Sequence, residues 1–209
     1  MKIAQIAPLY EAVPPKLYGG TEMVIAHLCD ALTDSGHDVT LFASAESSTE
    51  ARLVPMRDHS LRLDAVPLKS DLAAHLSMLY EVRELSHRFD ILHFHLDLLH
   101  FPLFEHVAHR CVTTIHSRTD LKDLPGAYAR AQTCGSRRGD GHGWWRLNLE
   151  DRVCCARPPA GLRKRTTASP FGLREAATLV ATRTGKATTI PAMPTSMLRA
   201  RERPVPRSD

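Results

Sequence analysis

The first 43 residues contain two short apolar runs with one helical pattern between them, and this spacing limits the folds open to the chain. Residues 2–7 (KIAQIA) form an apolar run that Pro8 ends, which predicts a buried strand. Residues 38–43 (DVTLFA) are rich in β-forming residues and predict a second strand. A helix between two strands this close makes a βαβ unit, whose strands are parallel. We therefore expect an α/β fold with a Rossmann-like, doubly wound parallel sheet and crossover helices.

The helix between these strands is marked at both ends. Residues 9–20 contain a Pro-Pro and a Gly-Gly pair, so they predict an irregular loop. Thr21 follows as the candidate N-cap, and Gly36 suits the positive φ that a helix C-terminus often requires. The apolar residues that share one face of this helix are Val24, Ile25, Leu28, Ala31 and Leu32.

Strand and helix patterns continue to alternate along the chain. A short strand is expected near Leu53-Val54, and a second helix over residues 70–88. Residues 90–95 (DILHFH) and 111–116 (CVTTIH) predict two further strands, with a third helix over residues 98–109 between them. The apolar residues of the second helix recur at helical spacing: Leu72, Leu76, Leu79 and Val82.

The last two strands each end in a histidine, His95 and His116. Ligands of open α/β sheets bind beyond the carboxyl ends of the strands. Gly19, Gly20 and Thr21 stand at the start of a helix, where bare backbone can approach a phosphate or a sugar. We therefore expect the Gly-Gly loop and both histidines to meet in one crevice. The structural alternatives are a plain tight turn for the glycines and a hydrogen-bonded strand end for His116.

Several known types of site are excluded by missing motifs. The chain has no GxGxxG, no P-loop G-K-[ST] and no GxSxG elbow. His93, His95 and His100 form an H-x-H-x4-H pattern, but no nearby Cys or Glu completes a zinc set, so no metal site is predicted. The other histidines of this part are expected at the surface or at helix ends: His27, His37, His59, His75, His87, His106 and His109.

The cysteines and the apolar runs bear on the compartment. Five cysteines at irregular spacing, without a CxxC pair, predict reduced thiols, and Cys29 and Cys111 are expected as small packing residues. No run approaches the roughly 18 apolar residues of a membrane helix, and the N-terminal run is too short for a secretory signal. We therefore expect a cytoplasmic protein without a transmembrane segment.

The composition changes after Arg130. Residues 1–130 hold 12 Lys and Arg against 17 Asp and Glu, whereas residues 131–209 hold 15 against 6, so the net charge moves from −5 to +9. The second part is also poor in Leu, Ile, Val and Phe, below the roughly 20% at which a segment struggles to bury a core. We expect one domain over residues 1–130 and a basic tail of low order over residues 131–209.

Three interpretations of the tail remain open. Its arginine clusters would neutralise phosphates, so it could bind nucleic acid or an anionic surface. It could equally be a solvated, disordered tail. Its richness in Arg, Ala, Pro, Gly and Thr, with stray Cys and Trp, is also typical of out-of-frame reading of a GC-rich gene, and the composition favours this third interpretation.

Five segments together resemble the N-terminal domain of GT-B glycosyltransferases of the family 4 type: KIAQIAPLY, KLYGGTE, GHDVTLFAS, FDILHFH and VTTIHS. The resemblance covers about residues 1–130 and implies the acceptor-side half of a GT-B cleft. It implies His116 as the catalytic residue. It implies substrate-binding roles for Gly19, Gly20, Thr21 and His95.

The same resemblance implies a reaction. A sugar would move from a nucleotide sugar, the donor substrate, to an acceptor hydroxyl, without a metal or another cofactor. In the family a second domain binds the donor and carries an E-x7-E pair, which is absent after Arg130. We therefore expect the donor half to be missing and the chain to be inactive alone, as a truncated or frameshifted form.

Two further positions depart from the family pattern. Met23 stands where the family often has Arg, which weakens an expected phosphate contact, and Ser117 stands where it often has Gly. The alternative function is a non-catalytic α/β binding module whose basic tail docks on nucleic acid or an anionic surface, although no specific nucleic acid is predicted. The sugar, the acceptor, the stereochemical outcome and the oligomeric state do not follow from the sequence.

Overall fold

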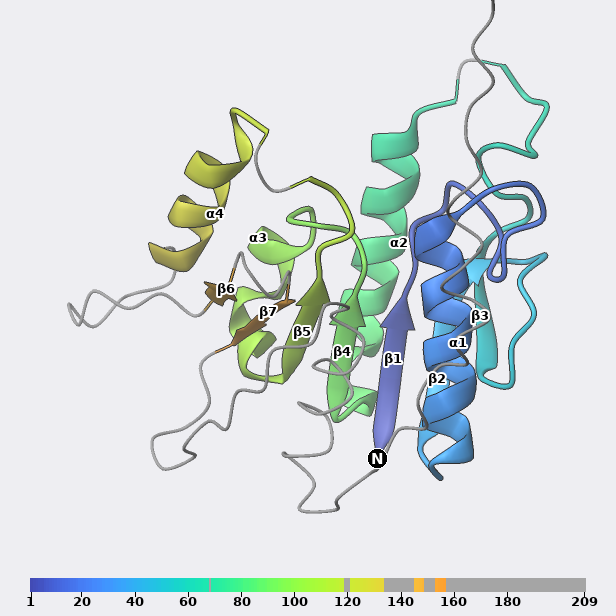
Figure 1. The fold of residues 1–209 in the computed structure, drawn as a ribbon, viewed down its shortest axis with the longest axis horizontal. Helices are drawn as coiled ribbons and strands as arrows, with labels where there is room; N and C mark the ends of the chain where they lie inside the picture. Colours follow the sequence, from blue (N-terminus) through green and yellow to red (C-terminus); the bar gives the residue numbers. More distant parts are fainter. Residues whose placement is uncertain (68, 119–120, 134–144, 149–152, 157–209) are drawn as a thin grey trace, which may run out of the picture.

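A computed structural model of the chain describes residues 1–67, 69–118, 121–133, 145–148 and 153–156. In these residues one sheet has the strand order β3-β2-β1-β4-β5-β7-β6 (Figure 1). The pairs among β1 to β5 are parallel, whereas β7 is antiparallel to β5 and β6. The strands are β1 Lys2–Ile6, β2 Asp38–Ser44, β3 Arg52–Arg57, β4 Ile91–Phe94, β5 Cys111–Thr114, β6 Trp145–Asn148 and β7 Val153–Ala156. The predicted Rossmann-like parallel sheet is confirmed over its first five strands.

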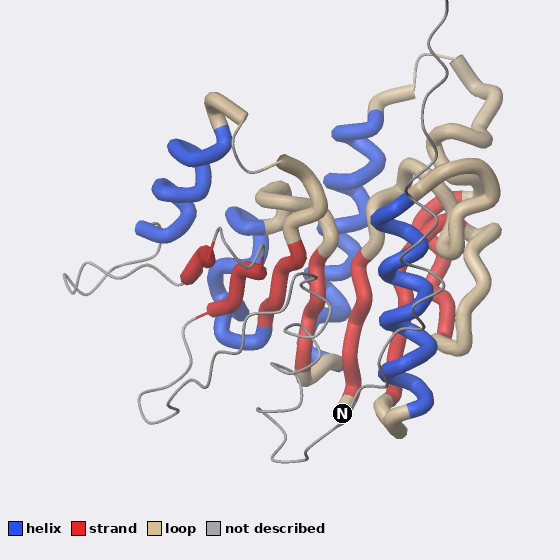
Figure 2. The backbone as a smooth tube through the Cα atoms, in the orientation of Figure 1, coloured by secondary structure: helices blue, strands red, loops and turns tan. Residues whose placement is uncertain are grey.

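Helices cover both faces of this sheet. They are α1 Gly20–Asp34, α2 Asp71–Leu85, α3 Phe101–Phe104 and α4 Leu124–Thr133, with 3-10 turns at Ser86–Arg88 and Glu105–Arg110. Figure 2 shows α1 in front of the sheet and α2 behind it. The apolar residues of α1 pack in one core and those of α2, α3 and α4 pack in another, so the sheet separates two hydrophobic cores. None of the helices in the described residues is long and apolar enough to cross a membrane.

Alternate residues of one strand supply these two cores. Ile3 of β1 packs with Ile25 and Leu28 of α1 in one core. Ile6 of β1 packs with Leu79 of α2 in the other. This alternation is the period of two that a strand buried on both faces requires.

The N-terminus of α1 differs from its prediction by two residues. Gly19 is the N-cap, without a capping side chain, and the N–H of Met23 donates to the Gly19 carbonyl at 3.1 Å. Thr21 is therefore not the N-cap and lies in the first turn. A Cβ on Gly19 would overlap the carboxylate of Glu22, so only glycine lets the helix begin here without displacing that side chain. The predicted positive φ of Gly36 is confirmed, at +80°.

The predicted third helix is shorter than expected. Residues 98–109 were expected to form one helix, but α3 covers only Phe101–Phe104 and the chain continues as a 3-10 turn. Pro102 explains the late start, because a proline lacks the N–H of a helix interior and is tolerated only in the first turn. Tyr128 of α4 is buried beside Phe101, with ring centroids 6.2 Å apart, so α4 covers the same core.

The short strand expected near Leu53-Val54 is confirmed as β3, which forms the outer edge of the sheet beside β2. Its fourth residue is Pro55, which has no N–H to donate. An edge strand accepts proline because its outward N–H groups have no neighbouring strand to bond. The register between β2 and β3 shifts at Ala43 and Ser44, close to this proline.

One face of α2 differs from the expectation. Leu79 and Val82 are fully buried as predicted, but Leu72 is 55% exposed. His75, which was expected at the surface, is buried instead. Its Nε2 accepts from the N–H of Leu9 at 2.9 Å, and its Nδ1 lies 2.7 Å from the Asp71 carbonyl, to which it donates. The backbone that leaves β1 needs a buried acceptor at this point, and the histidine provides it.

Candidate functional site

The carboxyl ends of β1, β4 and β5 lie side by side at one edge of the sheet (Figure 1). The helix that follows β1 covers one face, whereas the helix that follows β4 covers the other. This change of face between neighbouring strands marks the switch point at which open α/β sheets form their binding crevice.

His95 and His116 follow the last residues of β4 and β5 and meet at this edge. The Nδ1 of His95 lies 2.8 Å from the Nε2 of His116. The N–H of His95 also donates to the carbonyl of Ile6 at 3.1 Å, which continues the parallel pairing beyond β4 and fixes the backbone. The structure thus brings the two predicted histidines into one hydrogen-bonded pair.

The other ring nitrogen of His95 contacts Gln5, a residue that the sequence did not single out. The Nε2 of His95 lies 2.9 Å from the Oε1 of Gln5. Both ring nitrogens of His95 are therefore used within the protein. The only signal for Gln5 in the sequence is that it is the one polar residue inside the apolar run of the first strand.

Gln5, His95 and His116 differ in how far they are buried. Gln5 is 0% and His95 3% exposed, whereas His116 is partly exposed. Burial holds the pKa of His95 well below its usual value, and the neighbouring histidines His93 and His116 add to this effect. His95 is thus a neutral ring inside the protein, and His116 is the member that solvent can reach.

Two further histidines of the H-x-H-x4-H pattern bond to β5. The Nε2 of His93 lies 2.9 Å from the Thr114 hydroxyl, and the Nε2 of His100 lies 2.9 Å from the Thr113 hydroxyl. Burial lowers the pKa of His93 to about 3, with the charge of His116 as a second cause. Among the residues that the structure describes, no group of three or more His, Cys, Asp or Glu side chains is placed to hold a metal.

The Gly-Gly loop lies at the N-terminus of α1, at the carboxyl edge of the sheet (Figure 1). Gly20 is exposed and has open space where a side chain would stand. Glu22, in the first turn, is only 5% exposed, and burial raises the pKa of its carboxyl. The site therefore offers open backbone at Gly20 next to a carboxylate packed against Gly19.

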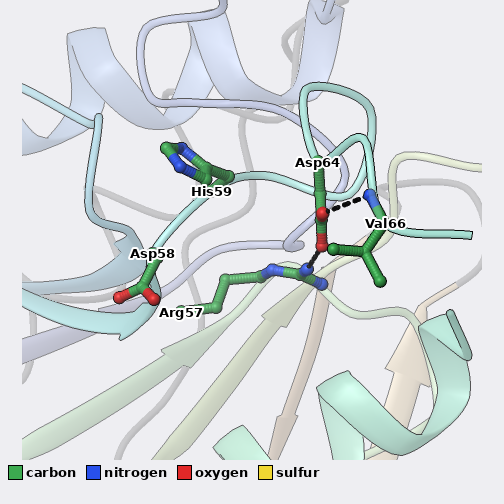
Figure 3. Close-up of a pocket in the computed structure, with 5 residues that line it drawn as sticks. All are labelled: Arg57, Asp58, His59, Asp64 and Val66. Atoms are coloured by element: carbon green, nitrogen blue, oxygen red, sulfur yellow. Dashed lines mark hydrogen bonds and ion pairs between the residues drawn. The ribbon is translucent and has the colours of Figure 1, made fainter.

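A polar cavity of about 350 Å³ lies at the end of β3 (Figure 3). Arg57 forms an ion pair with Asp64, whose carboxylate also accepts from the N–H of Val66 at 2.8 Å. That backbone hydrogen bond is the first cause of the lowered pKa of Asp64, followed by the charges of Lys69 and Arg57. The cavity is lined by Arg57, Asp58, His59, Asp64 and Val66, and its central charges are already paired with each other.

Both cysteines with described side chains have structural roles. Cys29 and Cys111 are buried, as predicted for small packing residues. Burial raises the pKa of the Cys29 thiol to about 12, and the charge of Asp30 adds to the shift. Such a thiol is a poor nucleophile. Cys134 lies outside the described residues.

Comparison with known proteins assigns the chain to a family. The model of Glycosyltransferase Family 4 matches residues 18–159, which is more than half of the chain. No curated protein matches it. Similar solved structures include AviGT4, a glycosyltransferase involved in avilamycin A biosynthesis, at 21% identity with a TM-score of 0.39, covering 56% of this chain and 32% of that one. Another is sucrose-phosphate synthase from Thermosynechococcus elongatus, at 13% identity with a TM-score of 0.44, covering 63% and 40%.

The chain thus spans about a third to two fifths of the length of these solved proteins. The match of the family model includes the Gly-Gly loop, α1, β4 and β5, together with both histidines of the pair. This chain belongs to glycosyltransferase family 4.

Proposed function

We propose that this chain forms the acceptor-side part of a glycosyltransferase, which moves a sugar from a nucleotide sugar to an acceptor hydroxyl. One observation carries the proposal. His116 is partly exposed at the switch point of the sheet and is held there by a 2.8 Å hydrogen bond to buried His95. Family membership supports the reaction class, and the position of this pair supports the proposed site.

His116 is the residue expected to contact the substrate. Its Nε2 is used in the pair with His95, and the substrate contact is proposed at Nδ1. As a neutral ring, His116 would accept a hydrogen bond from a sugar hydroxyl at Nδ1. As a cation it would donate to a phosphate oxygen instead. Both ring nitrogens of His95 are already hydrogen-bonded, so His95 orients the His116 ring and does not itself contact the substrate.

Gly19, Gly20 and Thr21 are proposed as the second part of the site. They begin a helix of 15 residues, whose first N–H groups and dipole favour an anionic or hydroxyl ligand. Gly20 has no neighbouring atom in the space of a side chain, so a ligand can approach its backbone closely. The buried carboxylate of Glu22 makes a hydroxyl the better partner for Gly19 itself.

The donor is proposed to bind mainly to a second domain, as in the family. Residues 1–130 would then be the acceptor-side unit, and the chain alone would be inactive, because the donor-binding side of the cleft would come from that second domain. The nucleotide sugar is a substrate, and no cofactor is assigned. A cytoplasmic location goes with this proposal, since Cys29 and Cys111 are buried as thiols.

The test uses the full chain, labelled with ¹⁵N-histidine. UDP-glucose, GDP-mannose, glucose and myo-inositol are added in turn while the histidine signals are recorded by NMR. We expect at least one of these ligands to shift the signals of His116 at millimolar concentration. In His116→Phe the ligand should no longer shift the signals of the neighbouring His95, which it should shift in the wild type. His106→Ala, which changes an exposed histidine of the 3-10 turn, is the matched control and should keep this shift.

Two outcomes would contradict the function. The first is that no sugar or nucleotide sugar moves the His116 signals. The second is that the chain binds only polyanions, with an affinity that falls steeply with salt, which would support the binding-module alternative instead.

A further inference from the structure

We infer that Gln5 is a positioning residue for His116 and acts through His95, an inference that rests on the function proposed above for His116. Gln5 lies in the middle of β1, where it pairs in register with His93 of β4. Its side chain is on the face of the sheet that α1 covers, as shown by its neighbours Ile3 and Ala7, which pack in the core of α1. No aqueous ligand reaches it, because it is 0% exposed.

The three side chains form a chain of hydrogen bonds across three strands. The amide oxygen of Gln5 has lone pairs only, so the Nε2 of His95, 2.9 Å away, must carry a hydrogen and donate it. A neutral imidazole has one N–H, so the Nδ1 of His95 is an acceptor. The Nε2 of His116, 2.8 Å from that nitrogen, must then donate to it. Gln5 thus fixes the direction of both hydrogen bonds.

This direction decides which atom His116 presents. With its hydrogen held at Nε2, the neutral ring of His116 has its lone pair at Nδ1. Protonation of His116 at Nδ1 leaves the chain of hydrogen bonds intact. Protonation of His95 at Nδ1 does not, since it would place two N–H groups against each other. Without the Gln5 acceptor, His95 could take either tautomer, and the hydrogen bond to His95 would no longer hold the hydrogen of His116 at Nε2.

The position of Gln5 is poorly explained by stability alone. Its other amide atom, Nε2, is buried and has no hydrogen-bond partner in the part of the chain that the structure describes. A buried amide without a partner destabilises a fold, and the positions two residues before and after it on the same face are apolar. An aliphatic side chain would fit the core of α1 better. The contact to His95 is the function that the glutamine adds.

The test compares Gln5→Met, which has similar length but no acceptor, with Gln5→Glu, which can still accept. In the full chain, ring ¹⁵N shifts of the histidines at pH 8 report which nitrogen carries the hydrogen, without any ligand. We expect His95 to have its N–H at Nε2 in the wild type and in Gln5→Glu, and to show mixed tautomers in Gln5→Met. A purely structural residue would change stability but would leave this signature unchanged.

The second readout is the affinity for the sugar ligand found with the His116 signals. Loss of one ordering hydrogen bond should weaken it about three- to tenfold in Gln5→Met, with recovery in Gln5→Glu. If Gln5→Met does not fold, as judged by circular dichroism, Gln5→Asn replaces it, because its shorter amide cannot reach His95.

The outcomes separate the two ideas. The inference is overturned if wild-type His95 carries its N–H at Nδ1, or if the tautomers of Gln5→Met equal those of the wild type. If the tautomers behave as expected but no sugar shifts His116, the proposed function fails while the proton arrangement stands. If sugar binds through His116 and Gln5→Met binds it equally well, only the positioning role of Gln5 is lost.

Discussion

The two faces of β4 are built from different chemistry although every residue of the strand is buried. On the face covered by α2 and α3, Phe94 packs against Phe104 with ring centroids 4.7 Å apart and stacks on His100 at 3.9 Å. On the opposite face His93 and His95 stand side by side, with ring centroids 4.3 Å apart. The comparison teaches that one strand can support both a core and a site, because alternate side chains point to opposite faces.

The difference between the faces is one of energetics. A large aromatic side chain in a core contributes several kcal/mol through burial and packing. A buried histidine contributes only about 1 kcal/mol for each hydrogen bond, and its neutral form must be maintained. We therefore expect the aromatic side chains to hold the fold and the buried histidines, of which His93 and His95 lie on the opposite face, to limit the pH range over which it is stable.

The largest expected effect is that of pH on stability. The pKa values of His75, His93, His95 and His100 are lowered by burial, so below pH 6.5 the unfolded chain binds protons that the folded chain does not. Stability is thus full above the unfolded pKa and falls with decreasing pH, by about 1.4 kcal/mol per unit for each of His93, His95 and His100, whose folded pKa values lie well below the usual value. Urea unfolding at pH 7.5 and 5.5 should differ by about 4 kcal/mol from these three histidines, and the lowered pKa of His75 adds in the same direction.

The matched control for this pH effect is His93→Leu, in which one buried histidine is missing. Its unfolding free energy should fall by about 1.4 kcal/mol less over the same range. Equal stability of the wild type at the two pH values would show that these histidines are not held neutral by burial.

The second prediction concerns the aromatic face. Phe94→Ala should lower the free energy of unfolding by about 3–5 kcal/mol, because it leaves a cavity between Phe104 and His100. Leu72→Ala, at a position 55% exposed, is the control and should change it by less than about 0.5 kcal/mol. Urea denaturation at pH 7.5 measures both. A loss below about 1.5 kcal/mol for Phe94→Ala would mean that this face is not the main source of stability.

The third prediction concerns the two glycines at the N-terminus of α1, which covers the histidine face of the sheet. Gly19→Ala should destabilise the chain by about 1 kcal/mol, since the new Cβ would overlap the Glu22 carboxylate and lie 3.0 Å from the Cβ of Pro15. Gly20→Ala meets nothing within 4 Å and should stabilise it by about 0.5 kcal/mol. Opposite shifts of the melting temperature are expected. Shifts of the same sign would show that the space at Gly19 is not limiting.

The smallest effect is expected when a polar pair of the histidine face is replaced as a whole. His93→Leu combined with Thr114→Val removes both partners of one hydrogen bond and should change stability by less than about 1 kcal/mol at pH 7.5. The single change Thr114→Val leaves the His93 ring nitrogen without its partner and should cost more. If the double variant is the less stable of the two, the hydrogen bond contributes more than its apolar replacement.

Much of the fold follows from local pattern. The alternation in residues 90–95 predicts a strand with His93 and His95 on one face. The prolines and glycines between the apolar runs of residues 2–43 separate strand, helix and strand, which predicts a βαβ unit. The rule for open sheets then places His95 and His116 at the same edge, where the structure has them 2.8 Å apart. These features depend on neighbours in the sequence or on the order of parallel strands.

The features that were missed depend on contacts between distant segments. The proposed role of Gln5 depends on its hydrogen bond to His95, which is 90 positions away in the sequence. His75 was expected at the surface because nothing near it in the sequence shows that the Leu9 amide needs an acceptor. The N-cap was misplaced because Thr21 is a common capping residue, whereas the packing of Glu22 against Gly19 is visible only in three dimensions. Polar residues in cores are predicted least well, since their partners decide where they lie.

Pro55 in the outer strand has a consequence for the behaviour of the chain in concentrated solution. The exposed edge of a sheet is a template on which another polypeptide can add a strand, and such growth leads to fibres. In β3 Pro55 has no N–H to donate, and Arg52 places a positive charge at the start of the strand. A second copy that approached this edge would meet a strand interrupted by a proline and the positive charge of Arg52, so aggregation should not begin at β3.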